Sequence, residues 1–293
     1  MIALATLEDY SQIRKIWEVC FTSENKFIEN FLNNCLPYSF TFVFKDKDSS
    51  NEICSVASVI PSIFKHNNVA TPCGYLYGIA TLPNHRGNSY GTKLIKHSEE
   101  FCKDLGYQFL FLYPASDGLT EHYTNLGFNT IVTHIETDFS VDQLSKNFYD
   151  INILEDSTGL DSESDPKNFS VNFEMSFNTF SNIDVKNKNG FFVKLNNKTF
   201  TLVPSETEVG VLVCLNNNFN SVFTENILED LLSITRSKGF VVLRIKEKAG
   251  FIPSDFSFLY KKEKLSCLIK PLNEYASDLY DPFTGILFTN PIE

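Results

Sequence analysis

The stretch GIATLPNHRGNSYGTKLI, residues 78–95, decides the fold, because it reads as the end of a strand, a polar loop and the start of a helix. Pro83 ends the strand, and the loop holds Arg86 with glycines at Gly87 and Gly91. Glycine permits positive φ and close ligand approach, so successive backbone amides can face one concavity at a helix start. The pattern predicts a pyrophosphate cradle, to which Arg86 adds a charge-assisted contact. An ordinary glycine-containing turn explains the two glycines equally well.

The segments on either side of this loop predict an α/β unit. Before it, polar turns separate strands expected at 39–45, 52–64 and 69–82, which favours an antiparallel meander. After it, a helix is expected over 90–105. The run FLFLY at 109–113 is typical of a strand buried on both faces in a parallel pair. Strand, loop, helix and buried strand together predict a right-handed crossover.

Apolar spacing and capping residues also predict the elements at the two ends of this unit. A short strand at 2–6 precedes one helix capped by Asp9 and a second helix over 24–33. A short helix at 118–126 and a strand at 128–137 complete the unit by about residue 140.

The second half repeats this order of elements. A hairpin is expected over 191–203, a buried strand over 209–215, a helix over 225–238 and another buried strand over 240–245. The loop at 216–223, NNNFNSVF, has neither Arg nor Gly, so it predicts no second phosphate cradle. We therefore expect domains at 1–140 and 169–293. The acidic segment between them, 141–168, reads as a linker, or alternatively as a rim that attracts a cationic substrate.

Composition limits the partners. The 293 residues carry 25 Lys and Arg against 36 Asp and Glu, a net charge of -11. Nucleic acids and anionic membranes both require concentrated positive charge, so neither is expected as the main partner. No apolar run approaches a membrane span, no signal-peptide pattern is seen, and the seven cysteines are scattered. We predict a cytoplasmic protein and no metal, since no cluster has metal-ligand spacing.

Three stretches together resemble the GCN5-related N-acetyltransferase (GNAT) superfamily: IALATLEDYSQI at 2–13, the stretch at 78–95, and LYPASDGLTEHYTNLGF at 112–128. The acetyl-CoA motif of that family, R/Q-x-x-G-x-G/A, is matched from Arg86 to Gly91 with Ser89 in place of the middle glycine. Serine has a Cβ and disfavours positive φ, so this departure predicts weaker pyrophosphate binding or a different turn.

The resemblance implies a mixed, strongly twisted central sheet flanked by helices, followed here by a degenerate GNAT-like α/β unit. It also implies a splayed strand pair, 75–82 and 109–113, that receives the pantetheine arm of acetyl-CoA. The cofactor-binding residues implied in this way are Ile79, Ala80, Thr81, Arg86, Gly87, Asn88, Ser89, Tyr90, Gly91 and Thr92.

The catalytic groups also follow from the resemblance. YTNLGF at 123–128 is similar to the family's Y-x-x-x-G-F, which makes Tyr123 the implied general acid for the CoA thiolate. The alternative is that Tyr123 is an amphipathic core residue. The two-unit layout resembles the enhanced-intracellular-survival branch, where the terminal carboxylate serves as base, and this implies the α-carboxylate of Glu293. The branch's third domain would not fit in this chain.

These observations predict an acetyl-CoA-dependent N-acetyltransferase acting on a primary amine of a small molecule or peptide, with a cationic acceptor favoured by the acidic charge. A non-catalytic acyl-CoA-binding or regulatory module is the alternative. An aminoacyl-tRNA-dependent transferase is disfavoured, because it needs a basic surface. The second unit is expected to wall the acceptor pocket or to mediate a homodimer.

Overall fold

The computed structural model describes residues 1–21, 25–46, 52–66, 69–143, 153–154, 170–173, 175–195, 198–215, 225–247 and 260–273. Three features named above lie wholly or largely outside these residues: the acidic segment 141–168, the loop 216–223 and the terminal Glu293.

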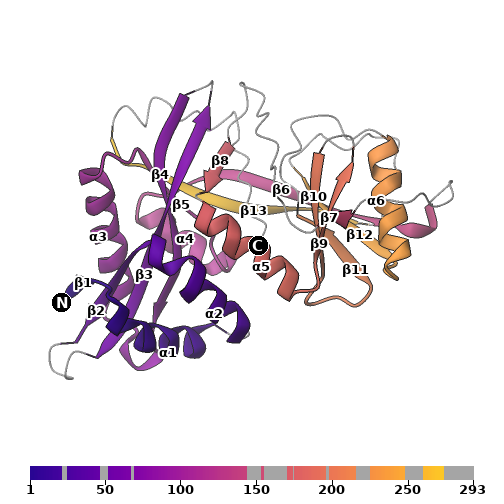
Figure 1. The fold of residues 1–293 in the computed structure, drawn as a ribbon. Helices are drawn as coiled ribbons and strands as arrows, with labels where there is room; N and C mark the ends of the chain where they lie inside the picture. The colour runs from indigo at the N-terminus through magenta and orange to yellow at the C-terminus, as the bar shows by residue number, and fades with distance from the viewer. Residues whose placement is uncertain are drawn as a thin grey trace.

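The first half forms the expected α/β unit (Figure 1). β2, β3 and β4 make an antiparallel meander, and β4 pairs with β5 in parallel, as predicted. Single turns of 3-10 helix lie at Leu7–Asp9, Leu36–Tyr38, Pro83–His85 and Val141–Gln143. In chain order the elements are β1 (Ile2–Leu4), α1 (Tyr10–Cys20), α2 (Asn25–Asn34), β2 (Phe40–Lys45), β3 (Ile53–His66), β4 (Val69–Thr81), α3 (Tyr90–Asp104), β5 (Phe109–Leu112), α4 (Asp117–Asn125) and β6 (Asn129–Ser140).

The second half repeats hairpin, strand, helix and parallel strand. β9 and β10 form the predicted hairpin, and β11 pairs with β12 in parallel across α6. The elements are β7 (Ile153–Leu154), β8 (Ser170–Phe173), α5 (Met175–Asn187), β9 (Phe191–Leu195), β10 (Lys198–Pro204), β11 (Val211–Cys214), α6 (Glu225–Ser237), β12 (Val242–Glu247) and β13 (Tyr260–Pro271).

A continuous sheet of 13 strands runs through both halves, in the order β1-β2-β3-β4-β5-β13-β6-β12-β11-β10-β9-β7, with β8 paired to β3. β13 comes from the end of the second half, yet it lies antiparallel between β5 and β6 (Figure 1). β6 pairs with β13 on one side and with β12 on the other. The sheet of the first half is therefore completed by a strand from the second.

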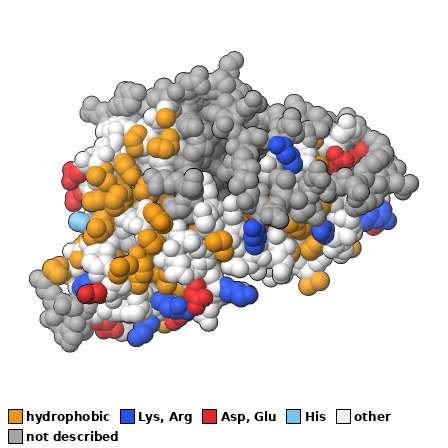
Figure 2. Space-filling model, in the orientation of Figure 1, with side chains coloured by type: hydrophobic (Ala, Val, Ile, Leu, Met, Phe, Trp, Pro, Cys, Tyr) orange, Lys and Arg blue, Asp and Glu red, His pale blue; other side chains and the backbone are white. Residues whose placement is uncertain are grey.

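Helices cover both faces of the first half of the sheet. Successive strand residues point to opposite faces. Thus Tyr75 packs with Trp17 of α1 and Phe31 of α2, whereas its neighbour Leu76 packs with Leu94 of α3. A separate core in the second half forms around Leu228 and Leu231 of α6. None of the described helices combines the length and apolar character that crossing a bilayer requires. Among the described residues on the face in Figure 2, cationic and acidic side chains are mixed along the lower edge.

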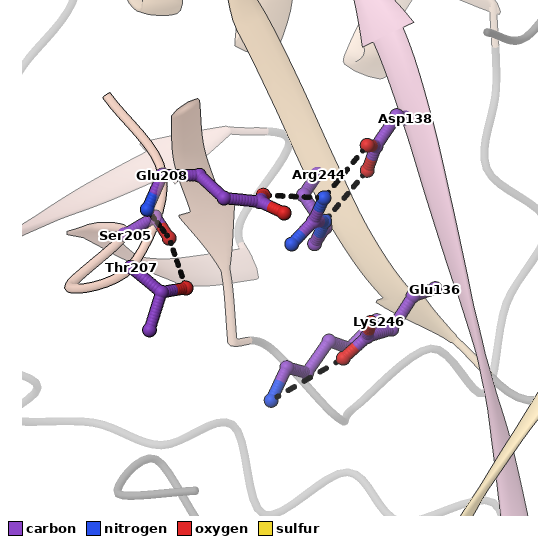
Figure 3. A network of polar contacts seen from close by, with 7 residues as sticks. All are labelled: Glu136, Asp138, Ser205, Thr207, Glu208, Arg244 and Lys246. Atoms are coloured by element: carbon purple, nitrogen blue, oxygen red, sulfur yellow. Dashed lines mark hydrogen bonds and ion pairs between the residues drawn. The ribbon is translucent and has the colours of Figure 1, made fainter. Parts of the chain in front are cut away.

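An ion-pair network fastens β6 to β12 at the junction of the two halves (Figure 3). Nε and Nη2 of Arg244 donate to the two carboxylate oxygens of Asp138, at 2.7 and 2.8 Å. Nη2 also contacts Glu208 at 2.6 Å, and Lys246 lies 3.8 Å from Glu136. The hydrogen bonds to Asp138 raise the pKa of Arg244 despite its partial burial. A bidentate pair of this kind fixes the register of the two strands.

Candidate functional site

The loop after β4 turns sharply and then starts α3. The Pro83–His85 turn closes with a hydrogen bond from the His85 amide to the Leu82 carbonyl, at 2.9 Å. Gly87 follows with φ of 85°. Ser89 is the N-cap of α3 and is left-handed, with φ of 58° and ψ of 24°. Serine thus adopts here the conformation that would suit glycine, at a cost in strain.

Backbone amides gather at this turn. The first hydrogen bond of α3 runs from the Lys93 amide to the Ser89 carbonyl, at 3.0 Å, so the amides of residues 90–92 have no partner within the helix. Within the described part of the chain, the amides of residues 87–89 donate to no protein acceptor either. Six successive N–H groups at the positive end of a helix dipole are therefore available to an anion.

Cationic side chains flank the amides. Nε of exposed Arg86 donates to the Thr81 carbonyl at 3.2 Å, which leaves its Nη groups without a protein acceptor among the described residues. Nζ of Lys93 lies 3.4 Å from the Asn88 carbonyl and 5.2 Å from the centre of the Tyr90 ring. The structure therefore brings the predicted loop residues 86–92 together in one place with two positive charges.

β4 and β5 diverge next to this loop. They pair only over Cys73–Tyr75 and Phe109–Phe111, so the rest of β4 lacks a strand on that side within the described chain. The Leu82 amide bonds to the Cys54 carbonyl on β3, and the Ala80 carbonyl accepts from Ser55 Oγ at 2.8 Å. Because the C=O and N–H of a trans peptide point in opposite directions, the Thr81 N–H and, by strand alternation, the Ile79 carbonyl face away from β3.

The three strand residues implied by the family resemblance, Ile79, Ala80 and Thr81, do not all face the same side of β4. Ile79 and Thr81 present backbone groups on the open side of β4. Ala80 turns its backbone carbonyl toward β3, where it accepts from Ser55 Oγ. The Thr81 carbonyl already accepts from Arg86 and from the thiol of Cys20, at 3.3 Å for the latter.

A bulge in β4 shapes the open side. The register with β3 shifts between Ala80 and Tyr77, and Gly78 lies in the shift with φ of 61°. A Cβ on Gly78 would lie 2.1 Å from Cζ2 of Trp17, so only glycine fits against the indole. The sequence reasoning missed the bulge, although an isolated glycine within a strand pattern is a signal for one.

A cavity of about 230 Å³ lies where β4 and β5 part. Its wall combines residues of α1, α2, β4, β5 and α4 with residues that follow α1 and β5. The lining residues are Trp17, Phe21, Phe27, Tyr75, Leu76, Tyr77, Gly78, Ile79, Leu112, Tyr113, Ala115, Leu119 and Tyr123. Phe180 of α5 lies behind this wall, with ring centres 5.4 Å from Phe27 and 6.4 Å from Tyr77. The second half of the chain therefore supports the cavity.

Tyr123 lies on α4 and lines the cavity. Its side chain is buried, and burial raises the pKa of its hydroxyl. The phenol is therefore protonated at neutral pH and able to give a proton. Tyr123 also belongs to the buried cluster with Leu94 and Phe128, so it is a core residue whose side chain lines the cavity.

One group of metal-binding side chain types lies beside the loop. One ligand atom from each of Asp46, Cys54 and His85 lies within 4.8 Å of the others. Burial raises the pKa of Cys54, which favours a neutral thiol over the thiolate that a metal requires. A structural zinc site takes four protein ligands, so within the described residues this group is incomplete.

Comparison with known proteins agrees with this geometry. Residues 1–131 match the family model described as an acetyltransferase (GNAT) domain. No curated protein matches the chain in sequence.

Solved structures resemble the chain over nearly its whole length. A GCN5-related N-acetyltransferase from Kribbella flavida has a TM-score of 0.71 at 12% identity, covering 94% of this chain and 73% of its own. A GCN5-related N-acetyltransferase from Anabaena variabilis has a TM-score of 0.62 at 11% identity, covering 94% and 74%. Eis1 from Mycobacterium abscessus has a TM-score of 0.64 at 10% identity, covering 93% and 74%. The likeness in fold therefore includes the second half of the chain, while the match to the acetyltransferase (GNAT) domain model is confined to residues 1–131.

Proposed function

We propose that the protein transfers the acetyl group of acetyl-CoA to a primary amine by direct attack on the bound thioester. The observation that carries this proposal is the junction of two features at the end of β4. The amides of residues 87–92, with Arg86, make an anion site, and the open side of β4 leads from that site into the cavity. In this arrangement the loop holds the pyrophosphate, while the Ile79 carbonyl and the Thr81 N–H pair with the pantetheine arm.

The reaction is a substitution at the acetyl carbonyl. The amine nitrogen attacks the carbonyl carbon, the C–S bond breaks, and the products are the N-acetyl amine and CoA thiol. The carbonyl oxygen gains negative charge in the tetrahedral intermediate, so a fixed N–H donor beside it lowers the barrier. The bulge at Gly78 interrupts the regular pairing of β4 with β3 between Tyr77 and Ala80. We propose that a backbone N–H in this interrupted part of β4 is the donor to the carbonyl oxygen.

The leaving thiolate needs a proton, and Tyr123 is the group proposed to give it. Burial keeps its hydroxyl neutral, and the side chain lines the same cavity as Ile79. The amine loses one proton in the same reaction, so the phenol is restored once that proton returns to it through the base or water.

None of the described cavity-lining residues carries a carboxylate or imidazole, so the base must come from elsewhere. The α-carboxylate of Glu293 remains our proposal, by analogy with the branch that uses its terminal carboxylate. Adding a few residues after Glu293 is expected to lower kcat and leave the affinity for acetyl-CoA unchanged. Full turnover by the extended protein would remove Glu293 from the mechanism.

The cofactor assignment is tested by calorimetry of acetyl-CoA binding. We expect one site per chain, and we expect Arg86→Ala to weaken binding about tenfold, as for one lost charge-assisted contact. Exposed Arg236, on α6 of the second half, provides the matched control, since Arg236→Ala should leave the affinity unchanged. Two sites per chain, or equal effects of the two variants, would contradict the assignment.

The non-catalytic module remains the second candidate, because the described cavity contains no base. It predicts tight acetyl-CoA binding without transfer to any amine. Mass spectrometry of amines incubated with protein and acetyl-CoA separates the two functions.

A further inference from the structure

The cavity has a chemical character that the family resemblance does not assign. Seven of its lining side chains are aromatic: Trp17, Phe21, Phe27, Tyr75, Tyr77, Tyr113 and Tyr123. The remaining lining residues are aliphatic or glycine, so no charged side chain lines the cavity within the described chain. The acidic side chains behind the net charge of -11 are therefore absent from the described walls of this cavity.

The floor and the mouth of the cavity differ in exposure. Trp17, Tyr75 and Leu112 are each 1% exposed and form part of the buried wall, whereas Leu119 of α4 is 38% exposed. A closed apolar cavity of about 150 Å³ accommodates benzene. The volume of about 230 Å³ here has room for an aromatic ring with a short chain.

Trp17 forms part of the buried wall. Its indole Nε1–H has no hydrogen-bond acceptor in the described part of the chain and almost no accessible surface, so the apolar part of Trp17 lines the cavity. The Trp17 ring is held by contacts with Phe31 at 4.4 Å and Phe21 at 5.5 Å, between ring centres.

Charge decides between classes of amine. A single ammonium gains about 0.5–2 kcal/mol over an aromatic face. A second or third ammonium in the same space would be desolvated without a carboxylate to pair with it. The walls therefore select against polyamines and favour an amine whose other groups are uncharged.

From these features we infer that the acceptor is an arylalkyl primary amine, whose ring occupies the aromatic cavity. This inference rests on the proposed acetyl transfer and names the substrate class of that site. The cationic acceptor expected from the net charge is thereby narrowed to an amine with a single positive charge.

The test compares kcat/KM for four amines: tyramine, phenethylamine, cadaverine and spermidine. We expect phenethylamine and tyramine each to exceed cadaverine and spermidine at least tenfold, because each places an aromatic ring in the cavity. Equal or higher kcat/KM for cadaverine or spermidine would overturn the acceptor assignment while leaving acetyl transfer intact.

A pair of variants at the cavity mouth tests the role of charge directly. Leu119→Glu places a carboxylate at the mouth and should raise kcat/KM for cadaverine relative to phenethylamine about tenfold. Leu119→Gln, of the same size and without charge, should leave that ratio near the wild-type value. No difference between the two variants would contradict the assignment. Absence of transfer to all four amines, with acetyl-CoA bound, would instead contradict the proposed function.

Discussion

Ser89 is the residue in the cofactor loop at which the sequence departs from the family pattern. The left-handed conformation of Ser89 shows that the loop keeps the glycine-like turn and bears the strain of a Cβ. A non-glycine residue in this conformation costs about 1–2 kcal/mol. The backbone amides still gather at the start of α3. The weaker pyrophosphate binding expected from Ser89 would therefore come from backbone strain and not from a loss of amide donors.

Replacing Ser89 by glycine should raise the free energy of unfolding by about 1 kcal/mol, since the strain is removed and no cap hydrogen bond from its side chain is lost. Ser116 is a matched control, because it is the N-cap of α4 and also makes no cap hydrogen bond, but its φ is -160°. Ser116→Gly should give no gain. Urea unfolding of both variants measures the difference, and equal effects would contradict strain at Ser89.

Tyr123 gives the second prediction at this scale. Tyr123→Phe should lower kcat about 100-fold, the size of a lost general acid, and leave the Kd for acetyl-CoA unchanged. Because burial raises the pKa of Tyr123, kcat of the wild type should show no loss from its ionisation below about pH 10, the ordinary tyrosine value. Tyr38, exposed and outside the cavity lining, provides the Tyr38→Phe control. Equal turnover in both variants would remove the role.

At the scale of the element, the bulge in β4 is the feature on which the site depends. Gly78 lies in it with positive φ against the Trp17 ring. Gly78→Ala should lower the free energy of unfolding by about 3 kcal/mol, from backbone strain and overpacking together. A methyl group added to Gly118 in α4 would meet no atom within 4 Å, so Gly118→Ala should be neutral or stabilising. Thermal unfolding compares them, and equal stability of the two variants would exclude this role for Gly78.

Most elements of the first half could be predicted because their patterns are local. α3 has an apolar stripe and ends before Gly106 at φ of 78°, and β5 is a short run of apolar residues. α5 escaped prediction because MSFNTFSNIDVKN contains serine, asparagine and threonine, which are poor helix formers with a weak apolar stripe. Its packing against α2, through the Asn30 side-chain amide and the Phe180 carbonyl at 2.8 Å, supplies the missing stability.

At the scale of the molecule, β13 links the end of the described chain to the first half. The sequence did not predict it, because YKKEKLSCLIKP begins with charged residues and its partners β5 and β6 lie more than 100 residues away. Its Cys267, Leu268 and Ile269 are fully buried in the first half. The expected domain bounds at 140 and 169 stay a prediction, but the sheet itself is shared between the halves.

Lys270 of β13 holds two elements of the site. Its Nζ donates to Glu99 of α3 at 2.7 Å and to the Leu126 carbonyl at the end of α4 at 2.8 Å. Burial acts to raise the pKa of Glu99, but hydrogen bonds from Lys270 and Lys103 outweigh it and leave the pKa lowered. The strand from the second half therefore ties α3 to the end of α4, the helix that carries Tyr123.

Lys270→Met should lower the free energy of unfolding by about 2 kcal/mol at neutral pH, because a largely buried carboxylate loses its partner. Lys103→Met is the matched control, since Lys103 pairs with the same Glu99 at the surface, and it should cost about 0.3–0.5 kcal/mol. A lowered pKa means that this stability is present above the ordinary glutamate pKa and lost as pH falls through the lowered value. The pH dependence below about 4.5 should be weaker in Lys270→Met. Equal costs for the two variants would contradict this role of Lys270.

The central claim is that acetyl-CoA bound at residues 86–92 gives its acetyl group to an amine in the cavity between β4 and β5. The most direct measurement is the release of CoA thiol from acetyl-CoA with phenethylamine, in the wild type and in Tyr123→Phe. We predict release that matches the N-acetylated amine mole for mole and falls about 100-fold in the variant. Thiol release that is equal in both proteins, or acetyl-CoA that binds without any release, would contradict the account.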